Sequence, residues 1–292
     1  MKVTVRDGRA MGSPLRISLP GSCDDDADAA WQVVRDVFTS AERALTRFAA
    51  DSPLSLLNGS AGTGCTVELP PMLARALAVA WRAFRTSRGR FDPRIIGALE
   101  AAGERAGVDL PPSPRALAAT DQWLELDARS GVARITAPID LGGIGKGLGL
   151  RWASAALQRA GHDRFLLSAG GDVVAVGNGP LDRPWIVGIE DPTGRRSTLV
   201  ALELTDAAAA TSSIAVRSWR GPDGQLCHHL IDPTTLAPAN PVWSAVTVID
   251  PDPAWAEVRS KVAFLAGRGI AETLGGRRAW WVAGSGDMHS AA

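Results

Sequence analysis

Hydrophobic and polar positions alternate loosely along residues 3–19, a pattern typical of two paired β-strands. Asp7 and Gly8 are turn-forming residues, and they predict the turn between the two strands. Behind the acidic run 24–26, apolar residues instead recur every three or four positions, which predicts an amphipathic helix. The apolar face of this helix consists of Trp31, Val34, Phe38, Leu45 and Phe48.

The rest of the chain mixes helical and strand patterns. Helices are predicted over about 71–87, 145–160 and 253–267, and strands over 132–135, 164–176, 185–190, 199–204, 245–249 and 278–282. The strands come in groups with only a few helices between them, which favours an α+β fold over a doubly wound parallel sheet. Residues 103–121 are rich in Gly, Pro and charge and predict a loop. We interpret 1–292 as a single domain with a possible subdomain boundary in that loop.

Charge and cysteine content narrow the class of protein. Lys plus Arg and Asp plus Glu both number 31 among the 292 residues, so no overall field favours nucleic acid or an acidic membrane surface. Three scattered cysteines predict neither a disulfide framework nor a cysteine metal site. The first residues contain no apolar leader, and no run is long enough to span a bilayer, so we expect a cytoplasmic protein.

The glycine-rich run over 140–149 departs from both familiar nucleotide-binding motifs. Lys146 is followed by Gly147 rather than the Ser or Thr that a Walker loop requires. No register supplies the three glycines of a dinucleotide fingerprint, and Pro138 interrupts the approach. What remains is a strand-to-helix turn with a lysine in the first helical turn. It suits an anion site at a helix amino terminus, or a tight turn that allows close packing, and both interpretations stay open.

Residues 225–235 form a second polar stretch, Gln-Leu-Cys-His-His-Leu-Ile-Asp-Pro-Thr-Thr. His229 stands three residues before Asp232, which begins an Asp-Pro turn, so an imidazole and a carboxylate come near one loop. A base and an acidic anchor, with glycine-rich backbones elsewhere in the chain, suit a phosphate-bearing ligand. A hydrogen-bonded core histidine and a turn-forming aspartate explain the same residues, and the stretch taken alone favours this structural interpretation.

Read in order, the motifs of the chain resemble those of the FAD:protein FMN transferases, or ApbE family, over about residues 11–267. Each motif is weak by itself, whereas the ordered set is specific. The motifs are Met11-Gly12-Ser13, Leu45-Thr-Arg-Phe48, Asp51-Ser-Pro-Leu-Ser-Leu-Leu-Asn58, Phe91-Asp92-Pro93, Asp140-Leu-Gly-Gly-Ile-Gly-Lys-Gly147, Ser168-Ala-Gly-Gly-Asp172, Pro184-Trp185, Asp191-Pro192, Ala210-Thr-Ser212, His228-His-Leu-Ile-Asp-Pro233 and Val246-Thr-Val248.

This resemblance implies two intertwined α/β subdomains with a nucleotide cleft between them. It also implies an enzyme that splits FAD with Mg²⁺, passes FMN to a Thr or Ser hydroxyl of a client flavoprotein, and releases AMP. By resemblance, His229 is the base and Asp232 lies in its neighbourhood. Lys146 complements the charge of the diphosphate. The remaining residues expected at the FAD site are Met11, Phe48, Asp51, Ser52, Asn58, Asp92, Gly142, Gly143, Thr211 and Ser212.

The expected metal site departs from the family pattern. The resemblance implies a backbone carbonyl, here Gly145, a carboxylate, here Glu257, and a Thr four residues later, where this chain has Lys261. An ammonium cannot coordinate a metal. Glu257 and Lys261 would form a plain i,i+4 salt bridge, or the Lys261 ammonium would supply part of the positive charge of the missing ion.

Further departures are Arg151, Ser213 and Leu236, each where the family has Asp or Gly. Together with Lys261 they put metal dependence in question more than the fold. Two alternatives to transfer therefore stay open from the sequence. One is an FAD pyrophosphatase that yields FMN and AMP, and the other is a flavin-binding paralogue without transfer activity.

Overall fold

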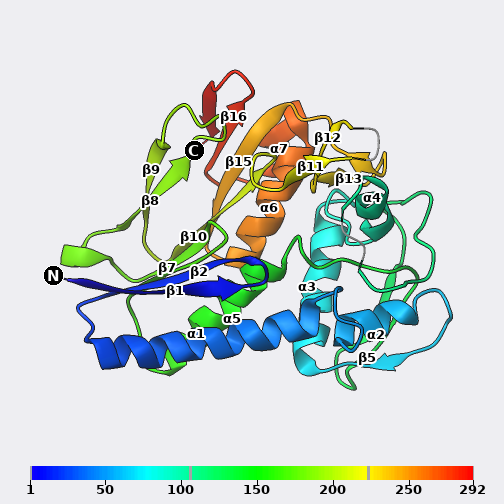
Figure 1. Ribbon diagram of the computed structural model, residues 1–292, viewed down its shortest axis with the longest axis horizontal. Helices are drawn as coiled ribbons and strands as arrows, with labels where there is room; N and C mark the ends of the chain where they lie inside the picture. Colours follow the sequence, from blue (N-terminus) through cyan, green and yellow to red (C-terminus); the bar gives the residue numbers. More distant parts are fainter. Residues whose placement is uncertain (1, 105–106, 222–223, 292) are drawn as a thin grey trace.

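The computed structural model describes residues 2–104, 107–221 and 224–291, and its main feature is an eight-stranded sheet (Figure 1). The sheet order is β1-β2-β6-β7-β10-β15-β16-β17, and each strand is antiparallel to its neighbours. These strands are β1 (Val3–Ala10), β2 (Ser13–Pro20), β6 (Phe165–Ala169), β7 (Asp172–Val176), β10 (Ala207–Ser213), β15 (Trp243–Asp250), β16 (Ala279–Ala283) and β17 (Met288–Ala291). The predicted α+β class is confirmed.

Smaller sheets and seven α-helices complete the described part of the chain. One small sheet has the order β3-β5-β4, and the others are the pairs β8-β9, β11-β12 and β13-β14. Their strands are β3 (Val67–Glu68), β4 (Leu124–Asp127), β5 (Val132–Ile135), β8 (Trp185–Glu190), β9 (Thr198–Leu204), β11 (Ser218–Arg220), β12 (Leu226–His228), β13 (Ile231–Asp232) and β14 (Ala237–Pro238). The helices are α1 (Asp24–Leu45), α2 (Pro53–Gly59), α3 (Pro71–Thr86), α4 (Ile96–Ala101), α5 (Gly145–Arg159), α6 (Pro253–Leu265) and α7 (Ile270–Thr273), and none of these could cross a membrane.

The turn between the first two strands does not lie where Asp7 and Gly8 predict it. Both residues lie inside β1, and the chain reverses at Met11 and Gly12, whose φ angles of 50° and 70° belong to the left-handed region. Gly8 is needed for packing instead. A Cβ atom at Gly8 would lie 2.8 Å from the ring of Trp31 on α1. The glycine therefore marks a close helix–strand contact.

Helix α1 follows its predicted apolar face as far as Leu45 and then ends. Val34 and Phe38 are fully buried, and Figure 1 shows α1 running beside α5. A Cβ atom at Gly149 of α5 would lie 2.7 Å from the Phe38 ring, so a glycine permits this close helix packing. Phe48 was predicted on the same face, but it lies beyond the helix and is 41% exposed.

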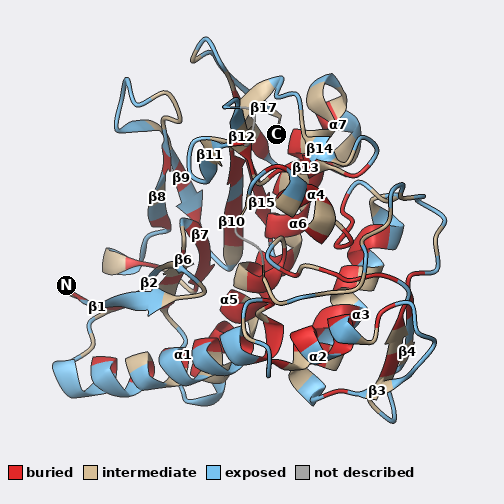
Figure 2. Cartoon of the chain, turned by 45° about the vertical axis from the view of Figure 1, so that its right-hand side comes forward, coloured by how far each residue is buried: buried red, intermediate tan, exposed pale blue. Residues whose placement is uncertain are grey.

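Helices α5 and α6 contribute buried residues to three of the hydrophobic clusters, and Figure 2 colours both helices largely as buried. A Cβ atom at Gly147 would come within 2.6 Å of Ala254 Cα, so the amino-terminal turns of the two helices lie almost backbone to backbone. The stretch between α4 and β4 forms no helix or strand in its described residues, which agrees with the loop predicted over 103–121. Residues 105–106 of that loop lie outside the described residues, and the subdomain boundary stays a prediction.

Candidate active site

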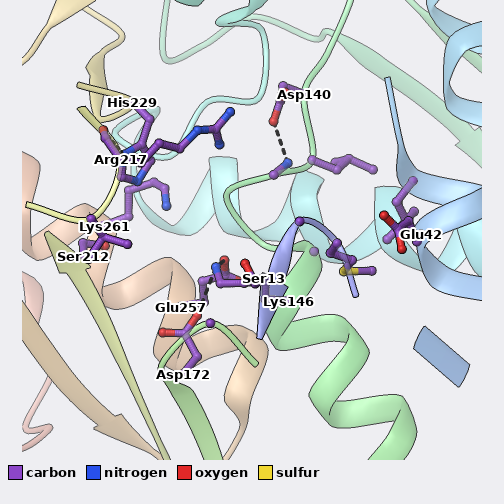
Figure 3. Close-up of a pocket in the computed structure, with 18 of the residues that line it drawn as sticks. Ser13, Glu42, Asp140, Lys146, Asp172, Ser212, Arg217, His229, Glu257 and Lys261 are labelled. Atoms are coloured by element: carbon purple, nitrogen blue, oxygen red, sulfur yellow. Dashed lines mark hydrogen bonds and ion pairs between the residues drawn. The ribbon is translucent and has the colours of Figure 1, made fainter. Parts of the chain in front are cut away.

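One concave site, here called the main pocket, has a volume of about 620 Å³ and opens where several distant segments meet (Figure 3). Met11 at the β1–β2 turn and Phe48 after α1 line one side. The pocket is also lined by the glycine-rich turn before α5, the β6–β7 turn, the end of β10 and the segment after it, helix α6 and the loop before β13. A volume in this range is typical of small-molecule sites.

Lys146 occupies the floor of the main pocket between two carboxylates. Its Nζ lies 2.6 Å from Glu257 Oε1 and 3.1 Å from Asp172 Oδ2. Burial alone would lower the pKa of this ammonium, but the two carboxylates outweigh burial and raise it above its ordinary value. Burial raises the pKa of Asp172, against the opposing effect of Lys146. The ammonium charge of Lys146 is therefore already matched within the protein.

Glu257 also occupies the amino terminus of α5. Its Oε2 accepts a hydrogen bond of 2.8 Å from the Gly147 amide, one of the free N–H groups that begin this helix. A carboxylate is favoured there by the helix dipole. The anion predicted for this helix terminus is thus supplied, at least at Gly147, by the protein's own side chain.

The glycine-rich turn is fixed by Asp140 and Arg47. Asp140, labelled in Figure 3, accepts a hydrogen bond from the Gly142 amide through its Oδ1. Its Oδ2 lies 2.6 Å from Arg47 Nε. A Cβ atom at Gly142 would lie 2.8 Å from Asp140 Oδ1, so only glycine leaves room for this arrangement. The turn is held by charge as well as by backbone conformation.

His229 reaches the main pocket from the loop between β12 and β13. Its Nδ1 lies 3.2 Å from the Arg217 carbonyl oxygen. Because a carbonyl only accepts hydrogen bonds, Nδ1 carries the proton of the neutral ring and Nε2 keeps a free lone pair. Burial, followed by the charge of Lys261, lowers the pKa of His229 to about 3. The ring is therefore neutral at pH 7, and a pKa this low makes it a weak base in the protein alone.

The preceding residue, His228, shows the structural role that was the alternative for His229. It is 6% exposed, and its Nε2 lies 3.0 Å from the Ala239 carbonyl oxygen. Its Nδ1 accepts a hydrogen bond from the Leu230 amide, and its ring packs edge-on against Phe264. Both ring nitrogens of His228 are used, so this histidine belongs to the core.

Lys261 does not form the i,i+4 salt bridge with Glu257 that the sequence offered as one interpretation. Glu257 turns to Lys146 and the α5 terminus, and among the described residues no carboxylate lies within ion-pair distance of the Lys261 ammonium. The Lys261 side chain instead passes over the glycine-rich turn. A Cβ atom at Gly143 would lie 3.0 Å from Lys261 Cε and 3.5 Å from its Nζ. Burial lowers the pKa of this ammonium.

A chain of ion pairs joins opposite sides of the pocket through Glu104. One carboxylate oxygen of Glu104 pairs with Arg217, and the other lies 3.0 Å from Arg47 Nη2. Arg47 is 2% exposed and pairs in turn with Asp140 at the glycine-rich turn. Arg217, whose carbonyl oxygen is bonded by His229, is thereby connected to the glycine-rich turn through side chains.

A model of the ApbE family matches residues 11–278 of the chain. The chain belongs to the ApbE family. A Haemophilus influenzae member named FAD:protein FMN transferase is 24% identical over 282 residues, which cover 91% of this chain and 81% of the relative. A Rhodobacter capsulatus member of the same name is 31% identical over 229 residues, which cover 75% of this chain and 43% of the relative.

Solved ApbE structures share this fold along its whole length. An ApbE protein from Thermotoga maritima matches with a TM-score of 0.84 at 24% identity, covering 99% of this chain and 96% of its own. The flavin transferase ApbE from Vibrio cholerae matches with a TM-score of 0.79 at 20% identity, covering 100% and 97%. The family resemblance drawn from the ordered motifs is therefore confirmed.

The main pocket of this ApbE-family chain brings together most residues predicted for the site. Ser212 Oγ bonds Ser260 Oγ at 2.9 Å, and Thr211 Oγ1 bonds Thr247 Oγ1 at 2.8 Å. Their roles toward a ligand stay predictions. The predicted residues that line the pocket are Met11, Phe48, Gly142, Gly145, Lys146, Thr211, Ser212, His229 and Glu257.

Other predicted residues do not line the main pocket and make internal contacts. Ser52 caps α2 by accepting a hydrogen bond from the Ser55 amide. Asn58 is fully buried and exchanges two hydrogen bonds with the backbone of Ile139. Asp51 is exposed, and Gly143 lies beneath Lys261.

Asp92 and Asp232 line a different cavity of about 270 Å³, here called the second pocket. Asp92 forms a buried ion pair with Arg94, at 2.7 Å between Oδ2 and Nη2. The Asp232 Oδ1 atom accepts hydrogen bonds from the amide and hydroxyl of Thr234, which closes the turn around Pro233. The structure thus separates both aspartates from His229.

Sequence reasoning missed several charged residues of the main pocket. Glu42, Arg47 and Arg217 line it, although none was singled out for a role. Arg47 lies inside the Leu45–Phe48 motif, which was a usable signal. Glu42 is one of many polar residues on α1, and Arg217 lies in a loop without a motif, so neither carried a sequence signal.

The residues present do not fit the divalent ion that the resemblance implies. Both carboxylate oxygens of Glu257 are engaged, one by the Lys146 ammonium and the other by the Gly147 amide. Lys261 brings a second ammonium to the place of the expected hydroxyl ligand, and an ammonium offers no lone pair. Positive side chains occupy the space in which metal ligands would have to converge.

Proposed function

We propose that this ApbE-family chain transfers the FMN part of FAD to a Thr or Ser hydroxyl of a client protein and releases AMP. The names of the relatives support the reaction class, since they are FAD:protein FMN transferases along most of this chain. The observation that carries the proposal is the position of His229. Its unprotonated Nε2 shares one pocket with the glycine-rich turn and two lysines.

The chemistry requires three things that this pocket supplies. The diphosphate must be held, its charge must be offset, and a base must stand near the incoming hydroxyl. In the proposed step the acceptor oxygen forms a bond to the phosphorus of the FMN half, and the bond from that phosphorus to the bridging oxygen breaks. His229 Nε2 takes the hydroxyl proton, and AMP leaves with the bridging oxygen.

The diphosphate would also prepare His229 for this role. In the protein alone, burial and then the charge of Lys261 lower the pKa of the ring. Phosphate oxygens beside Lys261 would offset that charge and bring the basicity of the ring closer to neutral pH, where a general base works best. The Thr or Ser identity of the acceptor and the FAD roles of Met11, Phe48, Thr211 and Ser212 belong to the same proposal.

The test is an incubation of the purified protein with FAD and a client flavoprotein that carries an acceptor Thr. We expect AMP, measured by chromatography, and flavin fluorescence that stays on the client after denaturation. A client with that Thr changed to Ala should stay unlabelled. AMP release without a labelled client would mean hydrolysis, and bound but unchanged FAD would contradict the proposal.

Replacing the proposed base isolates its contribution. We expect His229→Ala to lower the rate of transfer by about 10²–10⁴-fold, the usual contribution of a general base, while FAD still binds. His162→Ala is the control, because His162 does not line the main pocket. Undiminished transfer by His229→Ala would remove this histidine from the mechanism.

A further inference from the structure

Lysine is rare in this chain and concentrated in its main pocket. Only three of the 31 basic residues are lysines, namely Lys2, Lys146 and Lys261, and the last two both line the pocket. Elsewhere the chain uses arginine for its positive charges. A lysine ammonium binds phosphate as a compact point charge, whereas a guanidinium binds phosphate or carboxylate through a fixed fork of donors. The two pocket lysines are therefore unusual within this composition.

The four basic residues that line the main pocket differ in whether their charge is matched. Lys146 pairs with Glu257 and Asp172, as described above. Arg47 pairs with Asp140 and Glu104, and Arg217 pairs with Glu104. Within residues 2–104, 107–221 and 224–291, Lys261 has no carboxylate at ion-pair distance. Lys261 is thus the one member of this group without an ion pair among those residues, and Glu257, Asp172 and Asp140 act on its charge only from longer range.

The direction of the Lys261 side chain points this charge at the glycine-rich turn. Its Cε and Nζ lie over Gly143, where a Cβ atom would meet them at 3.0 and 3.5 Å. Figure 3 shows Lys261 near Arg217 and His229, while Glu257 and Asp172 lie together lower in the view. Because a half-buried ammonium is partly stripped of water, an unmatched one favours an anionic ligand strongly.

We propose that the Lys261 ammonium holds the diphosphate of the nucleotide in place of a divalent cation, so that nucleotide binding by this chain needs no metal. This inference rests on the proposed function, since it concerns the same FAD. Lys146 organises Glu257 and the α5 terminus, and Lys261 contacts the ligand. The two lysines thus divide between them a structural and a binding role.

The proposal also explains why a carboxylate and a lysine stand four residues apart on α6 without pairing. Glu257 is turned toward α5, where it caps the helix and fixes Lys146. Lys261, one turn further along α6, is left to face the pocket. A metal at this place would be repelled by two ammonium groups, and its carboxylate ligand is already used.

The test compares nucleotide binding with and without metal in the full chain. FAD and ADP are titrated into the wild-type protein by calorimetry, once in EDTA and once in Mg²⁺, with riboflavin as a ligand that lacks phosphate. The same titrations are made with Lys261→Met, which keeps the length of the side chain but removes its charge. Lys2→Met is the matched control, because Lys2 is exposed and lies outside the pocket.

We expect wild-type affinities for FAD and ADP in EDTA to stay within about threefold of those in Mg²⁺. Lys261→Met should bind both about 10- to 100-fold more weakly, the range for one lost hydrogen bond to a charged group, while riboflavin binding stays unchanged. Lys2→Met should behave as wild type. The wild-type comparison stands by itself even if the Lys261 variant folds poorly.

The outcomes separate this inference from the proposed function. Wild-type protein that binds FAD in Mg²⁺ but loses it in EDTA would overturn the inference and leave the transferase proposal standing. An unchanged ADP affinity in Lys261→Met would do the same. Failure of the wild type to bind FAD under either condition would overturn both.

Discussion

The main pocket and the second pocket both contain charged residues from the family motifs, but they treat the charges differently. In the main pocket, one ring nitrogen of His229 has no hydrogen-bond partner in the described part of the chain, and Lys261 has no carboxylate there at ion-pair distance. In the second pocket, Asp92 is matched by Arg94, and Asp232 by its own turn. The difference teaches that one set of motifs contains two kinds of residue. Some have polar groups that remain available to a ligand, and others use their polar groups in hydrogen bonds and ion pairs within the fold.

The largest effect on stability is expected from removing the buried ion pair of the second pocket. Asp92 is buried, and its carboxylate accepts hydrogen bonds from the amide and guanidinium of Arg94. We expect Asp92→Ala to lower the free energy of unfolding by about 3 kcal/mol, because it leaves a buried guanidinium with only part of its partners. Urea unfolding measures this change, and FAD titration of the folded protein should show no loss of affinity. Full stability together with weaker FAD binding would place Asp92 at the ligand instead.

An intermediate effect concerns pH and the main pocket. The pKa of His229 is about 3 in the folded chain, against an ordinary value near 6.5 in the unfolded chain. Between these values the unfolded chain binds a proton that the folded chain does not, so stability falls as the pH is lowered through this window. Relative to His229→Gln, the wild type should therefore lose about 2.5 kcal/mol of unfolding free energy between pH 7 and pH 4.5. Urea unfolding of both proteins at the two pH values measures it, and a constant difference would contradict the buried, neutral ring.

The smallest effect on stability is expected at Asp232, and it tests whether Asp232 has a structural role while His229, in the same motif, has a catalytic one. Among the described residues, the Asp232 carboxylate accepts hydrogen bonds only from Thr234, and Asp232 is half-buried. We expect Asp232→Ala to cost about 0.5–1 kcal/mol of stability, the value of a typical hydrogen bond, with transfer and FAD affinity kept. Thermal unfolding and the AMP assay measure the two effects. A large loss of transfer at unchanged stability would show that Asp232 acts through His229 after all.

The elements could be predicted from the sequence where local periodicity decides them. Helices α1, α3, α5 and α6 were predicted from apolar residues at three-to-four spacing or from residues typical of helix ends. Asp252, for example, caps α6 by accepting hydrogen bonds from the first amides of the helix. The predicted Asp7–Gly8 turn was wrong because the glycine at position 8 makes room for the Trp31 ring, a tertiary contact, and does not form a turn. No local signal distinguishes these two uses of glycine.

The site was predictable only as far as motif residues and their chain order allow. Their order gave the family, and nine of the predicted residues do line one pocket. Which of them are available to a ligand depends on partners far away in the chain. Lys146 and Glu257 are 111 residues apart, and their pairing decides that Lys261 stays unmatched. Such pairings are set by how α5 meets α6, which neither periodicity nor spacing encodes.

The side-chain route through Glu104 has a mechanical consequence. His229 is hydrogen-bonded to the backbone of Arg217, and the Arg217 side chain pairs with Glu104. Glu104 also pairs with Arg47, which pairs in turn with Asp140 at the glycine-rich turn. Such a linkage acts as a strut across the mouth of the enzyme. Any displacement that widens the opening to admit a bulky client must either stretch this strut or carry the histidine and the phosphate cradle along together.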